Sequence, residues 1–228
     1  GEGLQHQDGT SHLVAATIPN CKAYDPAFAC EMAVIVDQGM REMMVEQKDV
    51  FYYITLMNEN YAQPDLKTGT EAEILQGMYL LADNRSTLPK AKAEVTLLGS
   101  GAILREVMQA ADLLAKEGIA SQVFSVTSWS ELARNGQACE QAALADGKTL
   151  TPFVTAQLSN THGPVIAATD YVRAVAESVR AYLPPNRRYI ALGTDGFGRS
   201  DTRAELRHFF QVDAQHIAKA ARVALSQA

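Results

Sequence analysis

Four side chains that could exchange protons lie close together, among glycines, near the start of the chain. They are Glu2, His6, Asp8 and His12, and the segment around them has no helical or alternating pattern of apolar residues. Imidazole titrates near neutral pH, and a neighbouring carboxylate can orient it and hold its tautomer. A metal cluster, a plain surface loop and an active-site loop are all open interpretations. The irregular spacing without cysteine weakens the first, and two histidines with two acids favour the third.

Two glycine-containing turns match cofactor-binding motifs only in part. Gly99-Ser100-Gly101 lies between a predicted strand and a predicted helix, but position 104 is Leu, where a dinucleotide-binding turn has its third glycine. Thr194-Asp195-Gly196 lacks the first glycine of a Gly-Asp-Gly metal-binding motif, and no asparagine follows it. We therefore expect two tight turns, the second stabilised by Asp195 through its own backbone.

A third candidate is the segment Asn58-Glu59-Asn60-Tyr61, which directly follows an apolar run that we predict to be a buried strand. Ligands of open α/β sheets gather at the carboxyl ends of strands, so this segment is a candidate binding site. The alternative is a turn in which Asn and Glu side chains cap local backbone. A thiol nucleophile at Cys139 is disfavoured, because nothing in the sequence places His162 beside it.

The apolar pattern predicts strands alternating with helices, with Asp25-Pro26 at the start of the first long helix and a polar linker over residues 83–93. The expected strands are residues 15–18, 50–57, 94–98, 121–126, 153–158, 165–168 and 189–192, and the expected helices are residues 27–45, 71–81, 103–117, 127–144, 170–182 and 213–225. Such alternation is typical of an α/β fold, with helices on both faces of a mixed, mostly parallel sheet.

Composition narrows the functional classes. The chain has 228 residues, of which 47% are hydrophobic, and a net charge of −6, so binding to nucleic acid through a basic face is not expected. No run of about 18 apolar residues could cross a membrane. Three widely spaced cysteines fit a reducing cytoplasm. The chain begins with Gly1, which we interpret as the start of a piece of a longer protein.

Several short motifs together identify a family. They are Gly1-Glu-Gly-Leu-Gln-His6, Asp8-Gly9, Ser11-His12, Thr17-Ile-Pro-Asn-Cys21, Tyr24-Asp-Pro-Ala27, Asn58-Glu-Asn-Tyr61, Leu98-Gly-Ser-Gly101 and Leu192-Gly-Thr-Asp-Gly-Phe-Gly-Arg-Ser-Asp201. In these the chain resembles the homodimeric bacterial pyruvate dehydrogenases, the decarboxylating first components of the pyruvate dehydrogenase complex. The resemblance extends over essentially the whole chain, and transketolases are similar more distantly.

The resemblance implies two domains. Residues 1–90 are similar to the C-terminal half of a pyrimidine-binding domain, and residues 93–228 to a complete transketolase C-terminal-like domain. The family uses thiamine diphosphate and Mg²⁺ at a homodimer interface, held mainly by motifs upstream of those found here. We therefore expect the isolated chain to be inactive and to bind no cofactor or metal alone.

The resemblance also implies roles for the loop residues. The family decarboxylates pyruvate and transfers the acetyl group to the lipoyl group of a dihydrolipoamide acetyltransferase. By position, His6 would orient or protonate the substrate oxygen, and Glu2 would belong to the same hydrogen-bond network. Asp8 and His12 would orient and support the loop. Gln7 and Thr10 depart from the expected pattern, and His162 is given no role.

Two alternatives remain from the sequence. A transketolase acting on sugar phosphates would need basic residues to bind the phosphate, whereas the loop has Glu2 and Gln5. The second alternative belongs to another class, because the C-terminal domain could act only as a docking or assembly module. Dimerisation, or binding of the lipoyl-bearing partner by residues 93–228 without cofactor, would distinguish that role from catalysis.

Overall fold

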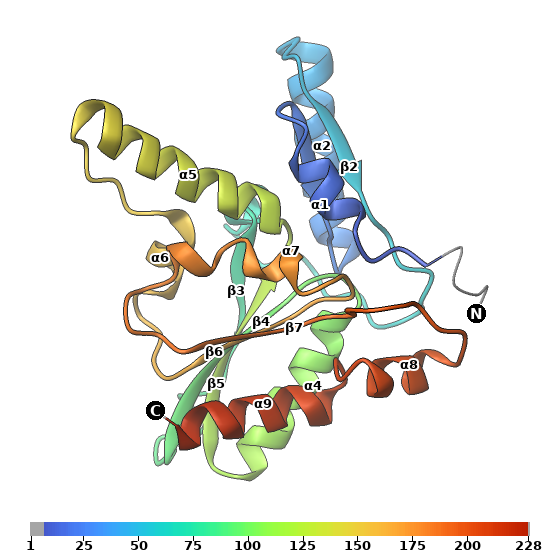
Figure 1. Cartoon of the computed structure of the whole chain (residues 1–228), viewed down its shortest axis with the longest axis vertical. Helices are drawn as coiled ribbons and strands as arrows, with labels where there is room; N and C mark the ends of the chain where they lie inside the picture. The colour runs from blue at the N-terminus through green and yellow to red at the C-terminus, as the bar shows by residue number, and fades with distance from the viewer. Residues whose placement is uncertain (1–6, 228) are drawn as a thin grey trace.

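The computed structural model describes residues 7–227, which form two sheets with helices packed around them (Figure 1). The first sheet has two parallel strands, β1 (Cys21–Tyr24) and β2 (Phe51–Ile54). The second has five strands in the order β3-β5-β4-β6-β7. The expected α/β class, with a mixed and mostly parallel sheet, is confirmed. None of the helices described is long and apolar enough to span a bilayer.

The first region, residues 7–76, is built around the two-stranded sheet. Its helices are α1 (Ser11–Ala16), α2 (Ala29–Met40), the π-helical η2 (Arg41–Val45) and α3 (Glu71–Gln76). The strand expected over residues 15–18 is wrong, because its first half belongs to the end of α1 and the rest is a turn. The strand expected over residues 50–57 forms as β2. It was expected to be buried on both faces, but it is half-buried and begins at an exposed Phe51. Among the described residues β2 pairs only with β1, which explains its exposure.

The start of α2 differs from the expected cap at Asp25-Pro26. The helix begins at Ala29, and the Glu31 carboxylate in its first turn binds the backbone amides that directly precede the helix. Glu31 Oε2 accepts hydrogen bonds from the backbone N–H groups of Ala27 (2.7 Å) and Phe28 (3.1 Å). Because Glu31 caps the helix, the Asp25 side chain does not, and it accepts a hydrogen bond from Thr55 instead.

The helix expected over residues 71–81 ends early, at Gln76. Gly77 follows with φ of 112°, a left-handed conformation that terminates a helix and favours glycine. A Cβ atom at this position would lie 2.5 Å from the Ser128 carbonyl oxygen. The chain then enters β3 (Met78–Asp83), which runs antiparallel to β5 (Ile119–Val126). Residues 78–83 therefore pair with the second sheet.

The second region, residues 78–227, contains the five-stranded sheet. Strands β4 (Ala93–Gly99), β5, β6 (Val165–Ala168) and β7 (Tyr189–Leu192) are parallel, as the alternating pattern predicts. Every residue of β5 and β6 is buried. Burial along the whole strand is typical of a parallel sheet covered on both faces, and here it includes the polar Ser121, Gln122 and Ser125 of β5.

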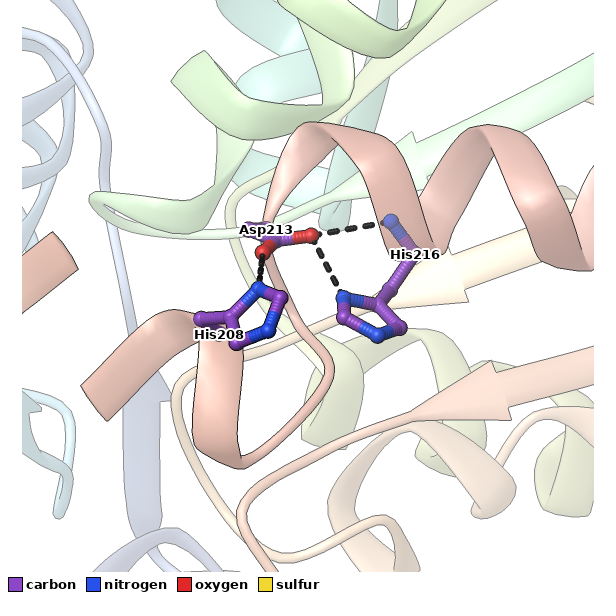
Figure 2. Close-up of side chains that lie close together, drawn as sticks. All are labelled: His208, Asp213 and His216. Carbon is purple, nitrogen blue, oxygen red and sulfur yellow. Dashed lines mark hydrogen bonds and ion pairs between the residues drawn. The ribbon is translucent and has the colours of Figure 1, made fainter. Parts of the chain in front are cut away.

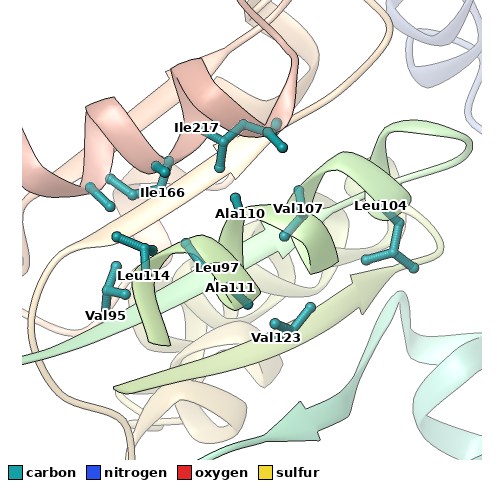
Figure 3. Close-up of a cluster of buried hydrophobic side chains, with 14 of the residues drawn as sticks. Val95, Leu97, Leu104, Val107, Ala110, Ala111, Leu114, Val123, Ile166 and Ile217 are labelled. Carbon is teal, nitrogen blue, oxygen red and sulfur yellow. The ribbon is translucent and has the colours of Figure 1, made fainter. Parts of the chain in front are cut away.

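Helices cover both faces of this sheet. Helices α4 (Ile103–Lys116) and α9 (Ala214–Ser226) pack on one face, where they form a core with β4, β5 and β6 (Figure 3). Helices α5 (Trp129–Asp146), α6 (Phe153–Leu158) and α7 (Ala174–Glu177) cover the other (Figure 1). Asp213 caps α9 by accepting a hydrogen bond from the His216 N–H, at the predicted start of that helix.

Three differences from the expected elements concern short segments. Residues 153–158 form α6 and were expected as a strand, because a short apolar run does not distinguish the two. The helix expected over residues 170–182 is reduced to α7 and the 3₁₀ turn η3 (Arg180–Tyr182). Helix α8 (Arg203–Phe209), none of whose residues is buried, was not predicted.

Polar contacts to backbone groups join the two regions. The Arg134 guanidinium on α5 donates to the carbonyl oxygens of Cys21 (2.5 Å) and Ile18 (2.7 Å). Ser128 Oγ donates to the Ala23 carbonyl at 2.6 Å. Glu31 Oε1 accepts from the Ser125 hydroxyl on β5 at 2.6 Å. The boundary therefore holds the first region in a fixed position beside the carboxyl ends of the larger sheet.

Candidate active site

A cavity of about 390 Å³ lies where the two regions meet. Loop residues 7–10 form one side, and segments that follow β2, β6 and β7 form others, together with α8. The lining includes Glu59, Asp170, Arg203 and Arg207. The carboxyl ends of strands thus open onto a cavity with both acidic and basic walls, the usual position of a ligand site in an α/β protein.

Asp8 organises the loop beside this cavity. Its Oδ1 accepts hydrogen bonds from the backbone N–H groups of Thr10 (3.0 Å) and Ser11 (2.9 Å), and its Oδ2 accepts from the Ser11 hydroxyl. Burial raises the pKa of Asp8, but these hydrogen bonds outweigh burial and lower it overall. The Gly9 carbonyl accepts from the Val172 N–H at 2.9 Å. The loop is therefore held to both α1 and the segment after β6.

His12 lies behind the loop and is not part of the cavity lining. Its ring packs edge-on against Tyr53 and Tyr171, with centroid distances of 5.5 and 4.6 Å. Burial lowers the pKa of His12 to about 4, against the opposing charge of Asp8. The imidazole is therefore neutral at pH 7, and its Nε2 pairs with Thr55 Oγ1 at 2.9 Å.

Thr55 connects His12 to a buried carboxyl group. Its hydroxyl donates to Asp25 Oδ1 at 2.8 Å, and can accept from the neutral imidazole of His12. Asp25 Oδ2 has no hydrogen-bond partner among the described residues. Burial raises the pKa of Asp25 to about 7, although Thr55 and Ser100 lower it. The result is a chain of hydrogen bonds from His12 on α1 to an acid that can be protonated near neutral pH.

An ion-pair network forms the acidic and basic wall. Glu59 pairs with Arg105 (2.7 Å) and with Arg207 (2.5 Å), and Arg207 also pairs with Glu106 (3.2 Å). Arg207 in particular lowers the pKa of Glu59. The Asn58-Glu59-Asn60-Tyr61 segment therefore contributes a charged group to the cavity, as the binding-site interpretation predicts, and Glu59 is held by side chains rather than by local backbone.

A further acid, Asp170, lines the cavity, and Asp195 lies in the chain between the lining residues Thr194 and Gly196. Burial raises the pKa of Asp170, with Arg207 opposing this effect. Asp195 accepts hydrogen bonds from the backbone N–H (3.2 Å) and the Nε (2.8 Å) of Arg173. The expectation that Asp195 acts through its own turn is thus wrong, because its partner lies 22 residues earlier.

The predicted site residues divide into three groups. Glu2 and His6 lie outside the described residues, so their predicted roles stay predictions. Asp8 lines the cavity, and His12 lies buried behind it. Gln7, noted as a departure from the family pattern, also lines the cavity.

Sequence reasoning missed several residues that determine this arrangement. Asp25 was interpreted as a helix cap, and Glu31 and Arg207 were not singled out. Only Glu31 has a local signal, since a glutamate near the start of a helix often accepts from the preceding amides. The contacts of Asp25 and Arg207 arise between segments distant in sequence, and no local pattern indicates them.

The described residues do not form a complete site for thiamine diphosphate and Mg²⁺. Among residues 7–227, the group of three His, Cys, Asp or Glu side chains close enough to share an ion is His208, Asp213 and His216. None of these three lines the cavity. No such group of three described side chains lies in the cavity, and we assign no reaction step through that cofactor.

Comparison with known families agrees with this fold. The family described as "Transketolase-like TK C-terminal domain" matches residues 77–213, and "Pyruvate dehydrogenase E1 component middle domain" matches residues 1–64. The chain belongs to the transketolase-like family with this C-terminal domain.

Curated relatives are more specific. The chain is 52% identical to the pyruvate dehydrogenase E1 component of Pseudomonas aeruginosa, over 99% of the chain and 26% of that protein. It is 50% identical to the E1 component of Escherichia coli, over 97% of the chain and 25% of that protein. The chain is therefore similar to one part of these bacterial proteins and spans about a quarter of their length.

Solved structures share the fold at lower identity. A transketolase of Pichia stipitis in complex with sedoheptulose 7-phosphate has a TM-score of 0.67 and 16% identity, over 99% of this chain and 28% of that chain. A structure described as "Split gene transketolase, inactive beta4 tetramer" has a TM-score of 0.60 and 17% identity, over 98% of this chain and 64% of that chain. At this identity the likeness concerns the fold alone.

Proposed function

We propose that the chain is part of a pyruvate dehydrogenase E1 component, which decarboxylates pyruvate and acetylates the lipoyl group of a partner acyltransferase. The observation that carries this proposal is the match of nearly the whole chain to bacterial E1 components at about half identity. The parent enzyme would be a cytoplasmic homodimer that uses thiamine diphosphate with Mg²⁺. The first domain would extend to about residue 90. Its last strand, β3, pairs with β5 in the sheet of the second domain.

In this proposal the chain supplies one wall of the active site. Glu2 and His6 would face pyruvate, with His6 orienting or protonating the reacting oxygen and Glu2 in the same hydrogen-bond network. Asp8 would hold the loop through its bonds to Thr10 and Ser11. A neutral, buried His12 suits a supporting role. At pH 7 its imidazole carries a proton on only one of its two nitrogens, so it is not the charged acid that would protonate a substrate.

The test is steady-state kinetics on the full-length protein with pyruvate. His6→Ala should lower kcat much more than it lowers affinity for thiamine diphosphate, because His6 would contact substrate. His162→Ala, at an exposed position outside the cavity, is the matched control and should leave kcat unchanged. An unchanged kcat in His6→Ala would contradict the assigned role, and no pyruvate decarboxylation by the unmodified protein would contradict the function itself.

The isolated 228-residue chain should be inactive and should not bind thiamine diphosphate with Mg²⁺ tightly, since no group of three His, Cys, Asp or Glu side chains lies together in the described cavity. Calorimetric titration tests this, and stoichiometric tight binding would contradict it. A transketolase activity is the weaker alternative, supported only by shared fold at 16–17% identity.

A further inference from the structure

A cluster of three metal-ligating side chains lies at the junction of α8 and α9, outside the cavity (Figure 2). His208 is in the last turn of α8, and Asp213 and His216 are in the first turn of α9. His208 Nδ1 lies 2.9 Å from Asp213 Oδ2, and His216 Nδ1 lies 2.8 Å from Asp213 Oδ1. One ligand atom from each residue falls within 4.8 Å of the others.

The backbone of this junction sets the position of all three side chains. Val212 N–H donates to the Arg207 carbonyl at 2.9 Å, and Gln211 has a left-handed φ of 60°, which makes the turn between the helices tight. Asp213 Oδ1 also accepts from the His216 N–H at 2.8 Å, so the carboxylate is fixed as the cap of α9. The Asp213 and His216 side chains are 17% and 20% exposed, and only His208 is open to solvent at 68%.

The cluster contains more than a helix cap requires. Capping uses one carboxylate oxygen and one backbone amide, whereas here each oxygen of Asp213 also faces an imidazole. The two rings lie 4.9 Å apart, edge to face.

These ligand types select a class of ion. Two imidazoles with one carboxylate suit Zn²⁺ and neighbouring transition metals such as Ni²⁺ or Cu²⁺, whereas Mg²⁺ and Ca²⁺ prefer sites made entirely of oxygen. Tetrahedral Zn²⁺ with bonds of about 2.0–2.1 Å separates its ligands by roughly 3.3 Å. The two imidazoles now lie 2.8 and 2.9 Å from different oxygens of Asp213, and one ligand atom from each residue lies within 4.8 Å of the others, so small side-chain rotations bring them to that separation. Each ring would bind through Nδ1 and carry its proton on Nε2.

We propose that His208, Asp213 and His216 form a surface site for one Zn²⁺-class transition-metal ion, with solvent as the fourth ligand. The ion links the end of α8 to the start of α9. Because Arg203, Leu206 and Arg207 of α8 line the cavity, the bound ion also fixes one wall of the candidate active site.

Calorimetric titration of the metal-free chain with ZnCl₂ tests the site, with thermal unfolding as a second measurement. We expect one ion per chain and a higher unfolding temperature when it is bound. Loss of a supporting contact already costs about 10–100-fold in metal affinity, so His216→Ala should lower Zn²⁺ affinity at least about tenfold. His208→Ala, at an exposed position, should do the same without disturbing the fold.

Two control variants distinguish this site from other histidines. His162→Ala should leave Zn²⁺ affinity unchanged, and so should His6→Ala, which tests the N-terminal loop. In ¹⁵N spectra, the Nδ1 signals of His208 and His216 should move on addition of Zn²⁺ while that of His162 stays in place. The proposal is overturned if Zn²⁺ does not bind, or if affinity in His216→Ala and His208→Ala equals that in His162→Ala.

Discussion

The two regions of the molecule bury their apolar residues to very different degrees. In the second region β5 and β6 are buried along their whole length, between helices on both faces. In the first region Met44 and Val45 of η2 are 74% and 78% exposed, and Phe51 at the start of β2 is 43% exposed. The second region is thus stabilised by its own core, whereas the first depends more on polar contacts across the boundary. The candidate active site lies at that boundary.

The largest expected effect is on stability, when a buried and an exposed apolar side chain, both in helices, are each shortened to alanine. Leu114 is fully buried on α4, and Met44 is exposed on η2. Leu114→Ala should lower the free energy of unfolding by about 2–5 kcal/mol, because it leaves a cavity in a close-packed core. Met44→Ala should change it by less than about 0.5 kcal/mol. Urea denaturation measures both, and equal losses would show that the two regions are not differently packed.

A smaller effect is expected at the boundary. Glu31 is fully buried and accepts from Ser125 and Tyr79 of the second sheet, as well as from the Ala27 amide. Glu31→Ala should cost roughly 1–3 kcal/mol, because it leaves these buried donors without partners. The exposed Glu71→Ala is the control, and urea denaturation is again the measurement. No loss in Glu31→Ala would mean that this carboxyl does not join the regions.

The smallest expected effect is a change in pH dependence at the His12–Thr55–Asp25 chain. The folded pKa of His12 is about 4 against 6.5 unfolded, so its contribution to stability is lost as pH falls from 6.5 to 4. The folded pKa of Asp25 is about 7 against 3.8 unfolded, so its contribution is lost as pH rises from 3.8 to 7. The two contributions oppose each other between pH 4 and 6.5.

Asp25→Asn should therefore reveal the His12 contribution. The amide keeps an acceptor for Thr55 but cannot ionise, so stability should rise with pH between 4 and 6.5 more steeply than in the unmodified chain. The added slope should be at most about 1.4 kcal/mol per pH unit. Urea denaturation at half-unit pH intervals measures it. Identical slopes in both proteins would refute the raised pKa of Asp25.

Much of the second region could be predicted because its elements carry strong local patterns. The β4–α4–β5 unit and α9 have apolar spacings that only one secondary structure satisfies. Errors at residues 71–81 and 153–158 concern short, ambiguous apolar segments, while the helix expected over residues 170–182 is shortened and α8 was not predicted. In the first case Gly77 ends the helix in a left-handed conformation that favours glycine, and a Cβ at this position would lie 2.5 Å from the Ser128 carbonyl oxygen.

The candidate site was predictable in a more limited way. The glycine-rich loop and the segment at Glu59 could be found, since both combine polar groups with turns beside predicted strands. Burial of His12 and Asp25, and the pairing of Glu59 with Arg207, depend on segments 30 to 148 residues apart. Because local sequence does not determine such contacts, neither the pKa of His12 nor that of Asp25 could be expected from it.

The Arg134 guanidinium has a consequence for how the molecule opens. It donates to the carbonyls of Ala16, Ile18 and Cys21, so one side chain holds the whole entry to β1. When this contact breaks, three carbonyl groups are released together, and β1 is then held to the start of α5 by the hydrogen bonds that Ser128 and Ser130 donate to the Ala23 carbonyl. Amide hydrogens of β1 and β2 should then exchange as one cooperative unit, at a lower free energy than those of β4 and β5. A single arginine would thus contribute much of the free energy that keeps the smaller sheet closed against the larger one.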